Sequence, residues 1–484
     1  MKKVFISGNF NILHPGHIRL LRFAKSLGDK LIVGVFSDKF AEGEGRIIEE
    51  NYRLAGIKSN NFVNEAYLIK QPLNKFLKKI NPDVIVKGKE YENMYNIEEE
   101  YIKSKNNKPK LIFGSGEITF SSRDLIGSEI TNSISKNYES NYSKDFLKRH
   151  KLSLQSLKKT IKKFNKLKVC VIGDIILDEY IVCQPIGMSQ EDFSVVASPI
   201  NSKLFLGGAG IVAAHSAKLG AETYHISLTG NDQESKTLEN LLKVNGVKAI
   251  LLKDNTRPTT VKKRYLSNLQ SLFRLTNLSQ QSTSKKIEEK IYNNFKKIVN
   301  KIDILIFSDF NYGVLSEDLI KRIIKLAKKR NILISADCQS SSQVGDISKY
   351  SGVDLITPTE REARLSIRNF NDGLIIMSEK LRKRTKVDNI LLKLGDEGML
   401  IHLKDEEQGY LNDRLPAINL NPVSISGAGD SALVSTSLSL YLTKNLWLSS
   451  FMGSLTAALQ VGRAGNIPIK QKELAALVDS ISKI

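Results

Sequence analysis

Two of the chain's six histidines fall in one short segment between an apolar run and a helical pattern. This segment, residues 8–17 (GNFNILHPGH), places His14 and His17 three positions apart. Gly8 permits a tight turn with close backbone approach, and Gly16 stands where the free amides of a helix start attract phosphate. Two imidazoles there can donate hydrogen bonds to a triphosphate as charge builds on the reacting phosphorus. The segment therefore predicts a triphosphate site rather than a pair of ordinary loop histidines.

A second segment with chemical potential is residues 424–430 (SISGAGD). Three small residues in it let successive backbone amides face an anion: Gly427, Ala428 and Gly429. Asp430 begins the helical pattern that follows, where it is placed to take a proton from a hydroxyl that attacks the γ-phosphate of ATP. Taken alone, the same four letters GAGD also fit a loop with an aspartate helix cap, so the surrounding sequence decides between the two interpretations.

Apolar runs that alternate with helical patterns provide the elements that must position both segments. These runs cover residues 2–7, 31–36, 84–86, 304–307, 332–335, 355–357 and 389–393. Strands that alternate with helices predict parallel, doubly wound α/β sheets. The histidine segment stands between the first run and a helical pattern from about His17 to Leu27, which is where such sheets bind ligands.

The length and composition of the chain indicate more than one domain. A chain of 484 residues is long enough for two or three domains, and 41% hydrophobic with 25% charged residues is an ordinary globular composition. A stretch rich in Ser, Asn and Lys separates the two α/β patterns and runs into a basic helical pattern over 152–164. We expect a first domain at 1–130, a polar linker with a basic helix at 131–165, and a second domain at 166–484.

The first domain resembles the cytidylyltransferase-like family, whose signature GxFDxLHxGH is similar to residues 8–17. Residues 82–91 (PDVIVKGKEY) resemble that family's PDVLVKGGDY segment. Residues 119–126 (TFSSRDLI) stand where the family has an ISSTxxI-type loop that contacts the nucleotide. The resemblance covers roughly residues 1–130 and implies a Rossmann-like nucleotidyltransferase domain.

The chemistry implied by this resemblance is attack by a sugar phosphate on the α-phosphorus of ATP or CTP, with release of pyrophosphate and Mg²⁺ on the phosphates. His14 and His17 would be catalytic, and the nucleotide would contact Gly8, Phe10, Gly16, Ser121, Ser122 and Arg123. Lys87 is either a phosphate or substrate contact or a lysine at the edge of the core. The family's Asp is Asn11 here, which loses a charge, and its Thr is Arg123, which could add a phosphate contact.

The second domain resembles the ribokinase-like (PfkB) sugar kinases along its whole length. Ordered motifs carry this resemblance: 173–178 (GDIILD, similar to GDVMLD), 207–210 (GGAG), 258–264 (PTTVKKR), 308–315 (SDFNYGVL, similar to SDYGKGVL), 393–398 (KLGDEG, similar to TLGxxG), 424–430 (similar to DxTGAGD) and 461–465 (VGRAG, similar to VGxxG). It implies a ribokinase-like α/β domain with Asp430 as base and Glu362 organising Mg²⁺ through water. ATP would contact Gly395, Gly398, Gly427, Ala428 and Gly429, and the sugar would contact Asp174, Asp178, Gly207, Gly208 and Arg264.

Five positions depart from the kinase pattern. They are Ser424 for the Asp of DxTGAGD, Ile211 for the Asn of GGAANVA, Thr359 for the Asn of NxxE, Tyr312 for the Lys of SDYGKG and Gln339 for the Lys of VDPKG. The kinase therefore either accepts a different substrate or is weak or inactive. We favour an altered but active kinase, because a drifted inactive one would be expected to lose its base, Asp430, before its periphery.

Together the two halves resemble the bifunctional heptose-phosphate kinase/adenylyltransferase family, with the two domains in reverse order. This resemblance implies synthesis of a nucleotide-activated sugar for a surface polysaccharide. The first alternative is a CTP-dependent transferase for a polyol or acidic sugar phosphate, fused to a degenerate kinase. Two others are a binding protein whose kinase fold senses a sugar nucleotide, and a nucleic-acid binder whose affinity would fall steeply with salt.

The formal charge of +21 is spread over scattered lysines on helix-like faces, so we expect a solvated surface rather than a nucleic-acid groove. The three cysteines lack CxxC spacing, which fits a reducing compartment and gives no zinc signal. No apolar run approaches the ~18 residues of a membrane span, and the first run is too short for a signal peptide. We expect a cytoplasmic protein without nucleic-acid or membrane partners, and the kinase resemblance implies a homodimer.

Overall fold

The computed structural model describes residues 2–11, 13, 15–40, 48–88, 96–105, 109–114, 138–192, 194–267, 270–279, 281–340, 344–419 and 422–483. The chain folds into two compact units. The N-terminal unit comprises Met1–Tyr138 and Asn369–Met377, and the C-terminal unit comprises Glu139–Arg368 and Ser378–Ile484. The segment that the sequence predicted as a linker thus divides, and its part from Glu139 onward belongs to the C-terminal unit.

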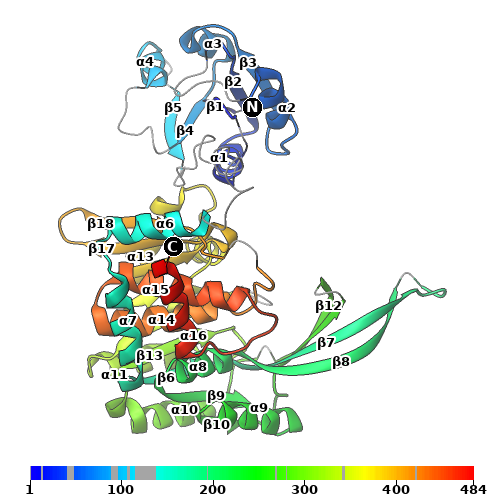
Figure 1. Ribbon diagram of the computed structural model, residues 1–484, viewed down its shortest axis with the longest axis vertical. Helices are drawn as coiled ribbons and strands as arrows, with labels where there is room; N and C mark the ends of the chain where they lie inside the picture. The colour runs from blue at the N-terminus through cyan, green and yellow to red at the C-terminus, as the bar shows by residue number, and fades with distance from the viewer. Residues whose placement is uncertain are drawn as a thin grey trace. The chain divides into compact units, whose positions relative to one another are not determined.

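The N-terminal unit is built on a parallel five-stranded sheet in the order β3-β2-β1-β4-β5 (Figure 1). Its strands are β1 (Lys3–Gly8), β2 (Lys30–Phe36), β3 (Glu65–Ile69), β4 (Val84–Gly88) and β5 (Lys110–Gly114). Its helices are α1 (Pro15–Lys25), α2 (Glu50–Lys58), α3 (Leu73–Ile80) and α4 (Ile97–Lys103). The order confirms the doubly wound α/β fold expected from the alternating pattern.

Both faces of this sheet are buried, which explains the continuous apolar runs of its strands. Val4 of β1 packs in a core that includes Leu21 of α1. The next residue, Phe5, packs on the opposite face in a core that includes Phe76 and Leu77 of α3. Alternate residues of one strand therefore serve two cores, and the strand stands in the middle of the sheet.

The C-terminal unit contains a nine-stranded sheet in the order β10-β9-β6-β13-β14-β15-β16-β17-β18, which is parallel except for its last two pairings. Its strands are β6 (Lys168–Gly173), β9 (Glu222–Thr229), β10 (Lys248–Lys253), β13 (Ile304–Asp309), β14 (Leu333–Cys338), β15 (Leu355–Ile356), β16 (Asn389–Lys393), β17 (Met399–Asp405) and β18 (Gly409–Leu415). The predicted runs at 304–307, 332–335, 355–357 and 389–393 all correspond to these strands.

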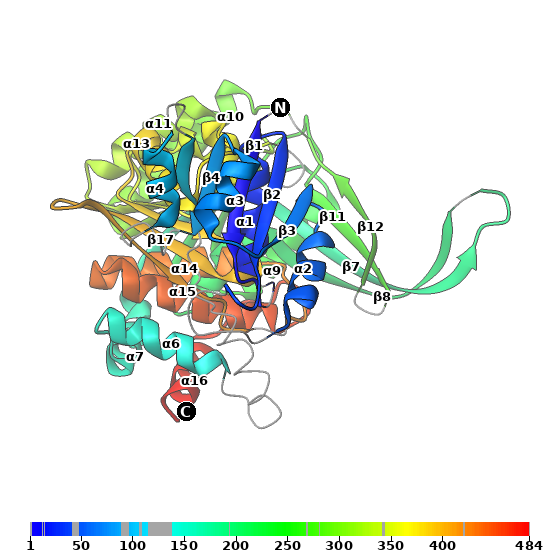
Figure 2. The ribbon, with the colours of Figure 1, turned by 90° about the horizontal axis from the view of Figure 1, so that it is seen from above.

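Helices cover both faces of the large sheet. They are α8 (Ala209–Lys218), α9 (Gln233–Val244), α10 (Lys285–Ile298), α11 (Glu317–Lys328), α12 (Glu360–Ile367), α13 (Leu374–Thr385), α14 (Ala428–Thr443), α15 (Leu446–Val461) and α16 (Gln471–Lys483). Figure 2 shows α10 and α11 on one side of the sheet and α14 and α15 on the other. Helix α14 is almost wholly buried, and it is the element that carries Asp430.

A second sheet of four strands, in the order β12-β11-β7-β8, lies beside the first. Its strands are β7 (Ile175–Met188), β8 (Val195–Gly208), β11 (Val261–Ser267) and β12 (Gln270–Asn277). The far ends of β7 and β8 extend as a two-stranded arm well away from the rest of the unit (Figures 1 and 2). The near ends of these strands carry the residues predicted to contact the sugar.

Two helices precede β6 and pack on the C-terminal unit, namely α6 (Tyr138–Arg149) and α7 (Leu154–Lys163). Helix α7 confirms the helix predicted over 152–164. The ring of Phe146 stacks on Phe451 at 6.0 Å and 11°, and Leu157 and Ile161 are buried in the core of the unit. Among the helices that the structure describes, none is both long and apolar enough to cross a membrane.

Candidate active sites

In the N-terminal unit, the turn that leaves β1 lies where the strand order reverses. β1 pairs with β2 on one side and β4 on the other, so its carboxyl end faces the crevice where parallel α/β sheets bind ligands. β1 ends at Gly8 and α1 begins at Pro15, so the predicted histidine segment joins them. Gly16 and His17 lie in the first turn of α1, whose free amides favour an anion. Four predicted residues lie outside the described part of the chain: His14, Ser121, Ser122 and Arg123.

Phe10 positions His17 from the side. The backbone of Phe10 is left-handed, with φ of 50°, and its side chain is buried. Its ring lies edge-on to the imidazole of His17, with centroids 5.1 Å apart. A Cβ on Gly8 would lie 3.1 Å from the Phe10 ring, so a side chain at position 8 would crowd that ring. The small size of Gly8 therefore leaves room for the Phe10 ring, which in turn packs against His17.

Lys87 lies at the carboxyl end of β4, the neighbour of β1. Its ammonium donates to Oε2 of Glu98 at 2.8 Å, and Ser7 Oγ donates to Oε1 of the same carboxylate at 3.1 Å. The Glu98 side chain is 1% exposed and that of Lys87 12% exposed. Glu98 thus pairs with Lys87 at the crevice edge. Sequence reasoning missed this carboxylate because it stands on α4, the helix after β4, outside the motifs that were recognised.

Arg53 is a second residue that sequence reasoning missed. Its guanidinium donates to the carbonyl oxygens of Asn9 and Phe36 at 2.7 and 2.8 Å, and it pairs with Asp38 at 2.6 Å. It therefore ties together the loops after β1 and β2. A signal did exist, since Arg53 stands four residues before the buried Ile57, on the core-facing side of α2.

The C-terminal unit encloses a cavity of about 950 Å³ between the two sheets and the start of α14. Most of the predicted kinase residues line it together: Asp178, Gly208, Arg264, Glu362, Gly395, Gly398, Gly427, Ala428, Gly429 and Asp430. Among the described residues, Asp174 and Gly207 are the two predicted ones that do not line it. The volume is in the range of small-molecule sites, and its walls come from chain segments as distant as β7 and α15.

Asp430 lies in the first turn of α14, directly after three small residues that also line the cavity, namely Gly427, Ala428 and Gly429. Its side chain is buried, and Oδ1 accepts a hydrogen bond from Nε2 of Gln339 at 3.2 Å. Burial and the nearby carboxylate of Asp337 raise the pKa of Asp430 to about 7. A carboxylate with this pKa, beside a helix start that favours anions, can accept a proton at neutral pH next to a bound phosphate.

Asp178 lies on β7 and faces the cavity. Its Oδ2 accepts a hydrogen bond from Asn466 Nδ2 at 2.8 Å, while its buried Oδ1 has no hydrogen-bond partner among the described residues. Nη2 of Arg264 lies 3.9 Å from that oxygen. A buried acceptor without a donor suits a ligand hydroxyl. Asn466, which sequence reasoning missed, directly follows the VGRAG motif and also accepts from Ser426 Oγ at 3.2 Å.

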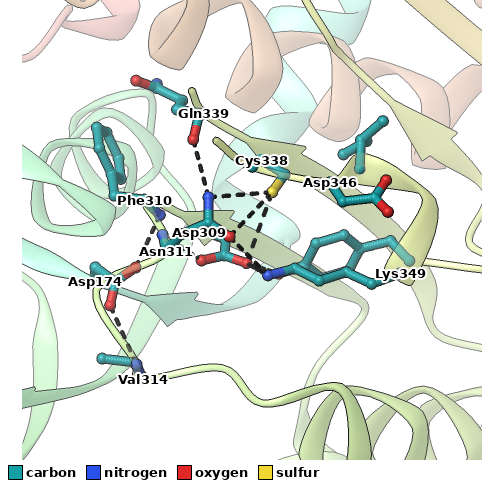
Figure 3. Close-up of polar contacts among 12 residues, drawn as sticks. Asp174, Asp309, Phe310, Asn311, Val314, Cys338, Gln339, Asp346 and Lys349 are labelled. Atoms are coloured by element: carbon teal, nitrogen blue, oxygen red, sulfur yellow. Dashed lines mark hydrogen bonds and ion pairs between the residues drawn. The ribbon is translucent and has the colours of Figure 1, made fainter. Parts of the chain in front are cut away.

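Asp174 is buried beneath the cavity and binds backbone instead (Figure 3). Its Oδ2 accepts from the amides of Phe310 and Tyr312 at 2.8 and 3.3 Å, and Oδ1 accepts from that of Val314 at 3.3 Å. Burial, together with the neighbouring Asp309, raises the pKa of Asp174 to about 7. Asp174 therefore fixes the loop after β13, and Phe310 of this loop lines the cavity.

Gly207 and Gly208 end β8 next to both aspartates. A Cβ on Gly207 would lie 2.5 Å from Oδ2 of Asp178. A Cβ on Gly208 would lie 2.2 Å from the carbonyl oxygen of Asp174, and Gly208 has a φ of 56°. Both positions therefore require glycine, because a Cβ at either one would clash with these oxygen atoms.

Glu362 lines the cavity from the first turn of α12. Its Oε1 accepts from the amide of Ser340 at 2.9 Å, and its Oε2 accepts from the amide of Thr359 at 2.7 Å. Thr359 in turn caps the helix, so the two residues form a capping box. In the described parts of the chain, no cluster of three or more His, Cys, Asp or Glu could hold a metal ion by itself.

The family of the C-terminal unit follows from comparison with known proteins. Residues 166–472 match the model of the pfkB family of carbohydrate kinases. The chain belongs to the pfkB family. Residues 5–135 match the cytidylyltransferase-like family, so the chain combines a cytidylyltransferase-like domain with a pfkB domain that follows it. Both family resemblances inferred from the motifs are thereby confirmed.

Curated relatives combine two activities, as their shared name states. The bifunctional protein HldE of Nitratiruptor sp. is 28% identical over 326 residues, which cover 66% of each chain. The bifunctional protein HldE of Campylobacter fetus is 30% identical over 315 residues, 64% of this chain and 66% of the relative. Each match therefore spans slightly less than two thirds of the relative's own length.

Solved structures show the fold of the pfkB domain. Arabidopsis thaliana ribokinase in complex with ribose and ATP aligns with a TM-score of 0.51 at 20% identity, over 64% of this chain and 98% of that one. Escherichia coli phosphofructokinase-2 aligns with a TM-score of 0.54 at 15% identity, over 65% and 99%. The expected ribokinase-like α/β architecture is confirmed.

The positions at which the pfkB domain departs from the kinase pattern are absorbed in different ways. Ile211 is fully buried in α8 as part of the core. Tyr312 is buried beside Phe310 with ring centroids 6.1 Å apart. Gln339 binds Asp430, and Thr359 caps α12. The structure thus gives four of the five changed residues defined packing or hydrogen-bonding roles.

Proposed function

We propose that the chain is a bifunctional enzyme of nucleotide-sugar synthesis. The pfkB domain would phosphorylate a heptose-like sugar phosphate with ATP. The cytidylyltransferase-like domain would transfer a nucleotidyl group from a nucleoside triphosphate to a sugar 1-phosphate and release pyrophosphate. The observation that carries the kinase half is Asp430, a buried carboxylate with a pKa of about 7 at the start of α14.

In the kinase step, the oxygen of the sugar hydroxyl attacks the γ-phosphorus of ATP while Asp430 accepts the hydroxyl proton. The bond between the γ-phosphorus and the β–γ bridging oxygen breaks, and ADP leaves. The amides of Gly427, Ala428 and Gly429 face the transferred group from the start of α14. Gly395 and Gly398 would contact the nucleotide from the loop after β16.

The sugar end of the cavity carries features that suit a phosphorylated sugar. Oδ1 of Asp178 is an acceptor for a hydroxyl. Four cations from β11 and β12 line the cavity and suit a phosphate ester: Lys262, Lys263, Arg264 and Arg274. Asp174, Gly207 and Gly208 would act on the sugar indirectly, by shaping the backbone around it.

The proposed cofactors are ATP and Mg²⁺, with CTP as the alternative nucleotide of the N-terminal domain. Mg²⁺ is bound in such sites by phosphates and one or two carboxylates and keeps several waters. Glu362 fits this role through water, because both of its oxygens already accept backbone amides. Mg²⁺ would offset the charge of the phosphates there.

For the N-terminal domain, the switch-point crevice supports His14 and His17 as the groups that stabilise the reacting α-phosphoryl. Gly8, Phe10 and Gly16 would shape the triphosphate turn, and the predicted loop at Ser121, Ser122 and Arg123 would complete it. Lys87 is fixed at the crevice edge by Glu98, so a substrate phosphate would have to share that ammonium with a buried carboxylate.

The test follows both products with one substrate panel. Pyrophosphate release is measured with ATP and then CTP against sugar 1-phosphates, and ADP formation is measured on the matching 7- and 6-phosphates. ADP that appears only with a sugar phosphate supports the kinase half. Pyrophosphate without ADP on every sugar phosphate would overturn it and leave a transferase with a kinase-shaped scaffold.

We also propose a cytoplasmic homodimer. The three cysteines are buried and unpaired, as in a reducing compartment. The β7–β8 arm exposes large apolar side chains, with Ile186 70% and Ile200 66% exposed, and a second copy could cover them. Light scattering should give the mass of a dimer, and an Ile186→Asp/Ile200→Asp chain should give that of a monomer. A monomeric wild type contradicts the dimer.

A further inference from the structure

Lys393 ends β16 and stands where the family pattern TLGxxG has threonine. Its side chain lines the cavity but is only 14% exposed. The ammonium forms an ion pair with Oδ1 of Asp337 at 2.8 Å, and the Asp337 side chain is 1% exposed. Lys393 is thus a mostly buried lysine of the cavity wall, and its ion pair with the buried Asp337 stabilises it.

The ammonium of Lys393 lies against the loop that precedes Asp430. A Cβ on Gly429 would lie 3.2 Å from Nζ of Lys393, so the absence of a side chain at position 429 makes room for this approach. Burial by itself lowers the pKa of a lysine, but the carboxylates of Asp337 and Glu362, with that of Asp430, outweigh it and raise the pKa of Lys393. The group is therefore a cation at neutral pH.

Lys393 is also the one cation among the described lining residues that does not come from β11 or β12. The other four all lie on β11 and β12 at the sugar end: Lys262, Lys263, Arg264 and Arg274. The two lysines of the family pattern are replaced by Tyr312 and Gln339. Tyr312 is buried against Phe310, and the side-chain amide of Gln339 donates a hydrogen bond to Asp430. A phosphoryl group beside Asp430 would meet the start of α14 and the ammonium of Lys393, and both would offset the negative charge of the nearby carboxylates.

We propose that Lys393 is a catalytic residue of the kinase reaction, whose ammonium contacts the γ-phosphoryl group of ATP during transfer. This inference rests on the proposed kinase function. As the acceptor oxygen bonds to the γ-phosphorus, the acceptor proton goes to Asp430 and the bridging oxygen leaves with ADP. The lysine offsets charge on the phosphoryl oxygens throughout, and Asp337 positions it. Lysine serves such sites as a point charge.

A purely structural ion pair is the competing explanation, and the chain offers a matched control for it. Lys349 pairs with Asp309 at the end of β13, the strand next to the one that carries Asp337. The side chains of Lys349 and Asp309 are 12% and 1% exposed (Figure 3). Tyr350 also donates to Asp309 at 2.6 Å. Lys349 is not among the described residues that line the cavity. Its loss should therefore cost stability without touching a γ-phosphate.

The experiment titrates the full chain, in Mg²⁺, with ADP and with the non-hydrolysable ATP analogue AMP-PNP. Three chains are compared: wild type, Lys393→Met and Lys349→Met. The N-terminal domain is the same in all three, so differences report on the pfkB domain. We expect Lys393→Met to weaken AMP-PNP binding about 10- to 100-fold and ADP binding less than about 3-fold, as for loss of one charged hydrogen bond. Lys349→Met should leave the ratio of the two affinities unchanged.

Equal loss for both nucleotides, or no difference among the three chains, would overturn the role of Lys393. If thermal denaturation shows that the Lys393→Met chain does not fold, the double variant Lys393→Met/Asp337→Asn is titrated in its place. The second substitution removes the carboxylate that Lys393→Met leaves unpaired. ADP formation on the sugar-phosphate panel separates the two proposals. If Lys393→Met forms ADP at the wild-type rate, the catalytic role of Lys393 is rejected and the kinase activity is retained. If the wild type forms no ADP and binds no AMP-PNP, both proposals are rejected.

Discussion

The two candidate sites arrange their charges in opposite ways. In the N-terminal crevice the described charges pair off, with Lys87 on Glu98 and Arg53 on Asp38. In the pfkB cavity, the carboxylates of Asp337, Glu362 and Asp430 lie around Lys393, and burial and Asp337 raise the pKa of Asp430 to about 7. The first site pairs its charges, whereas the second contains a carboxylate whose raised pKa suits the proton transfer that we propose.

The chemistry of the two proposed nucleophiles explains this difference. A sugar 1-phosphate is already an anion at neutral pH, so nucleotidyl transfer needs charge stabilisation and orientation but no base. A sugar hydroxyl is neutral and must lose its proton during attack, so the kinase needs a base of suitable pKa. The fold alone would not reveal this, because both domains present a helix start to a phosphate.

The strongest way to break the comparison is Asp430→Asn. Loss of a general base should lower ADP formation by about 10²- to 10⁴-fold, because the amide cannot accept the hydroxyl proton. Pyrophosphate release by the other domain serves as the control and should stay at the wild-type rate. Loss of both activities in a folded chain would show that the two sites are not independent.

The reciprocal substitution, His17→Ala, should act on the N-terminal domain alone. Removal of one donor to a developing charge costs about 10²- to 10³-fold, so pyrophosphate release should fall by that factor. ADP formation is measured in the same samples and should not change. A fall in ADP formation with an unchanged thermal midpoint would contradict the assignment.

The two aspartates of the GDIILD motif sharpen the comparison within the kinase cavity. Asp178→Asn should raise the KM for the sugar phosphate roughly 10- to 100-fold, because a charged acceptor is lost, with little change in the KM for ATP. Asp174→Asn should instead lower the free energy of unfolding by about 1–3 kcal/mol, because it disturbs the loop amides at Phe310 and Val314. Steady-state kinetics measures the KM, and denaturant titration measures the free energy of unfolding. If only Asp174→Asn raised the KM, Asp174 rather than Asp178 would be the residue that contacts the sugar.

The smallest expected effect is a difference in pH dependence. Because the pKa of Asp430 is raised to about 7, its basic form prevails above that pH and is lost as the pH falls through it. The kcat/KM for ADP formation should therefore fall about tenfold between pH 8 and pH 6. The profile of pyrophosphate release should not share this step near pH 7. A flat kinase profile would argue against Asp430 as the base.

Much of this arrangement could be predicted from residues close together in sequence. The apolar runs predicted the central strands, and GAGD followed by a helical pattern predicted the helix start that carries Asp430. Pairings between distant residues could not be read in this way. Lys393 meets Asp337 and Asn466 meets Asp178 only after the sheets have formed.

The motif GDIILD shows the limit within six residues. Both aspartates are buried, and their spacing does not say which one faces the cavity. Asp174 precedes β7, and the amides of the loop after β13 capture it, whereas Asp178 lies within the strand. The answer depends on a loop 136 residues further along the chain.

The carboxamide of Asn466 has a consequence for the choice of substrate. It bridges Asp178, at the sugar end, to Ser426, in the loop before α14. One side chain thus sets the distance between the carboxylate that would hold one sugar hydroxyl and the loop that would hold the phosphoryl donor. In the proposed kinase, Asn466 would therefore favour sugars whose reactive hydroxyl lies at the matching distance from the hydroxyl bound by Asp178.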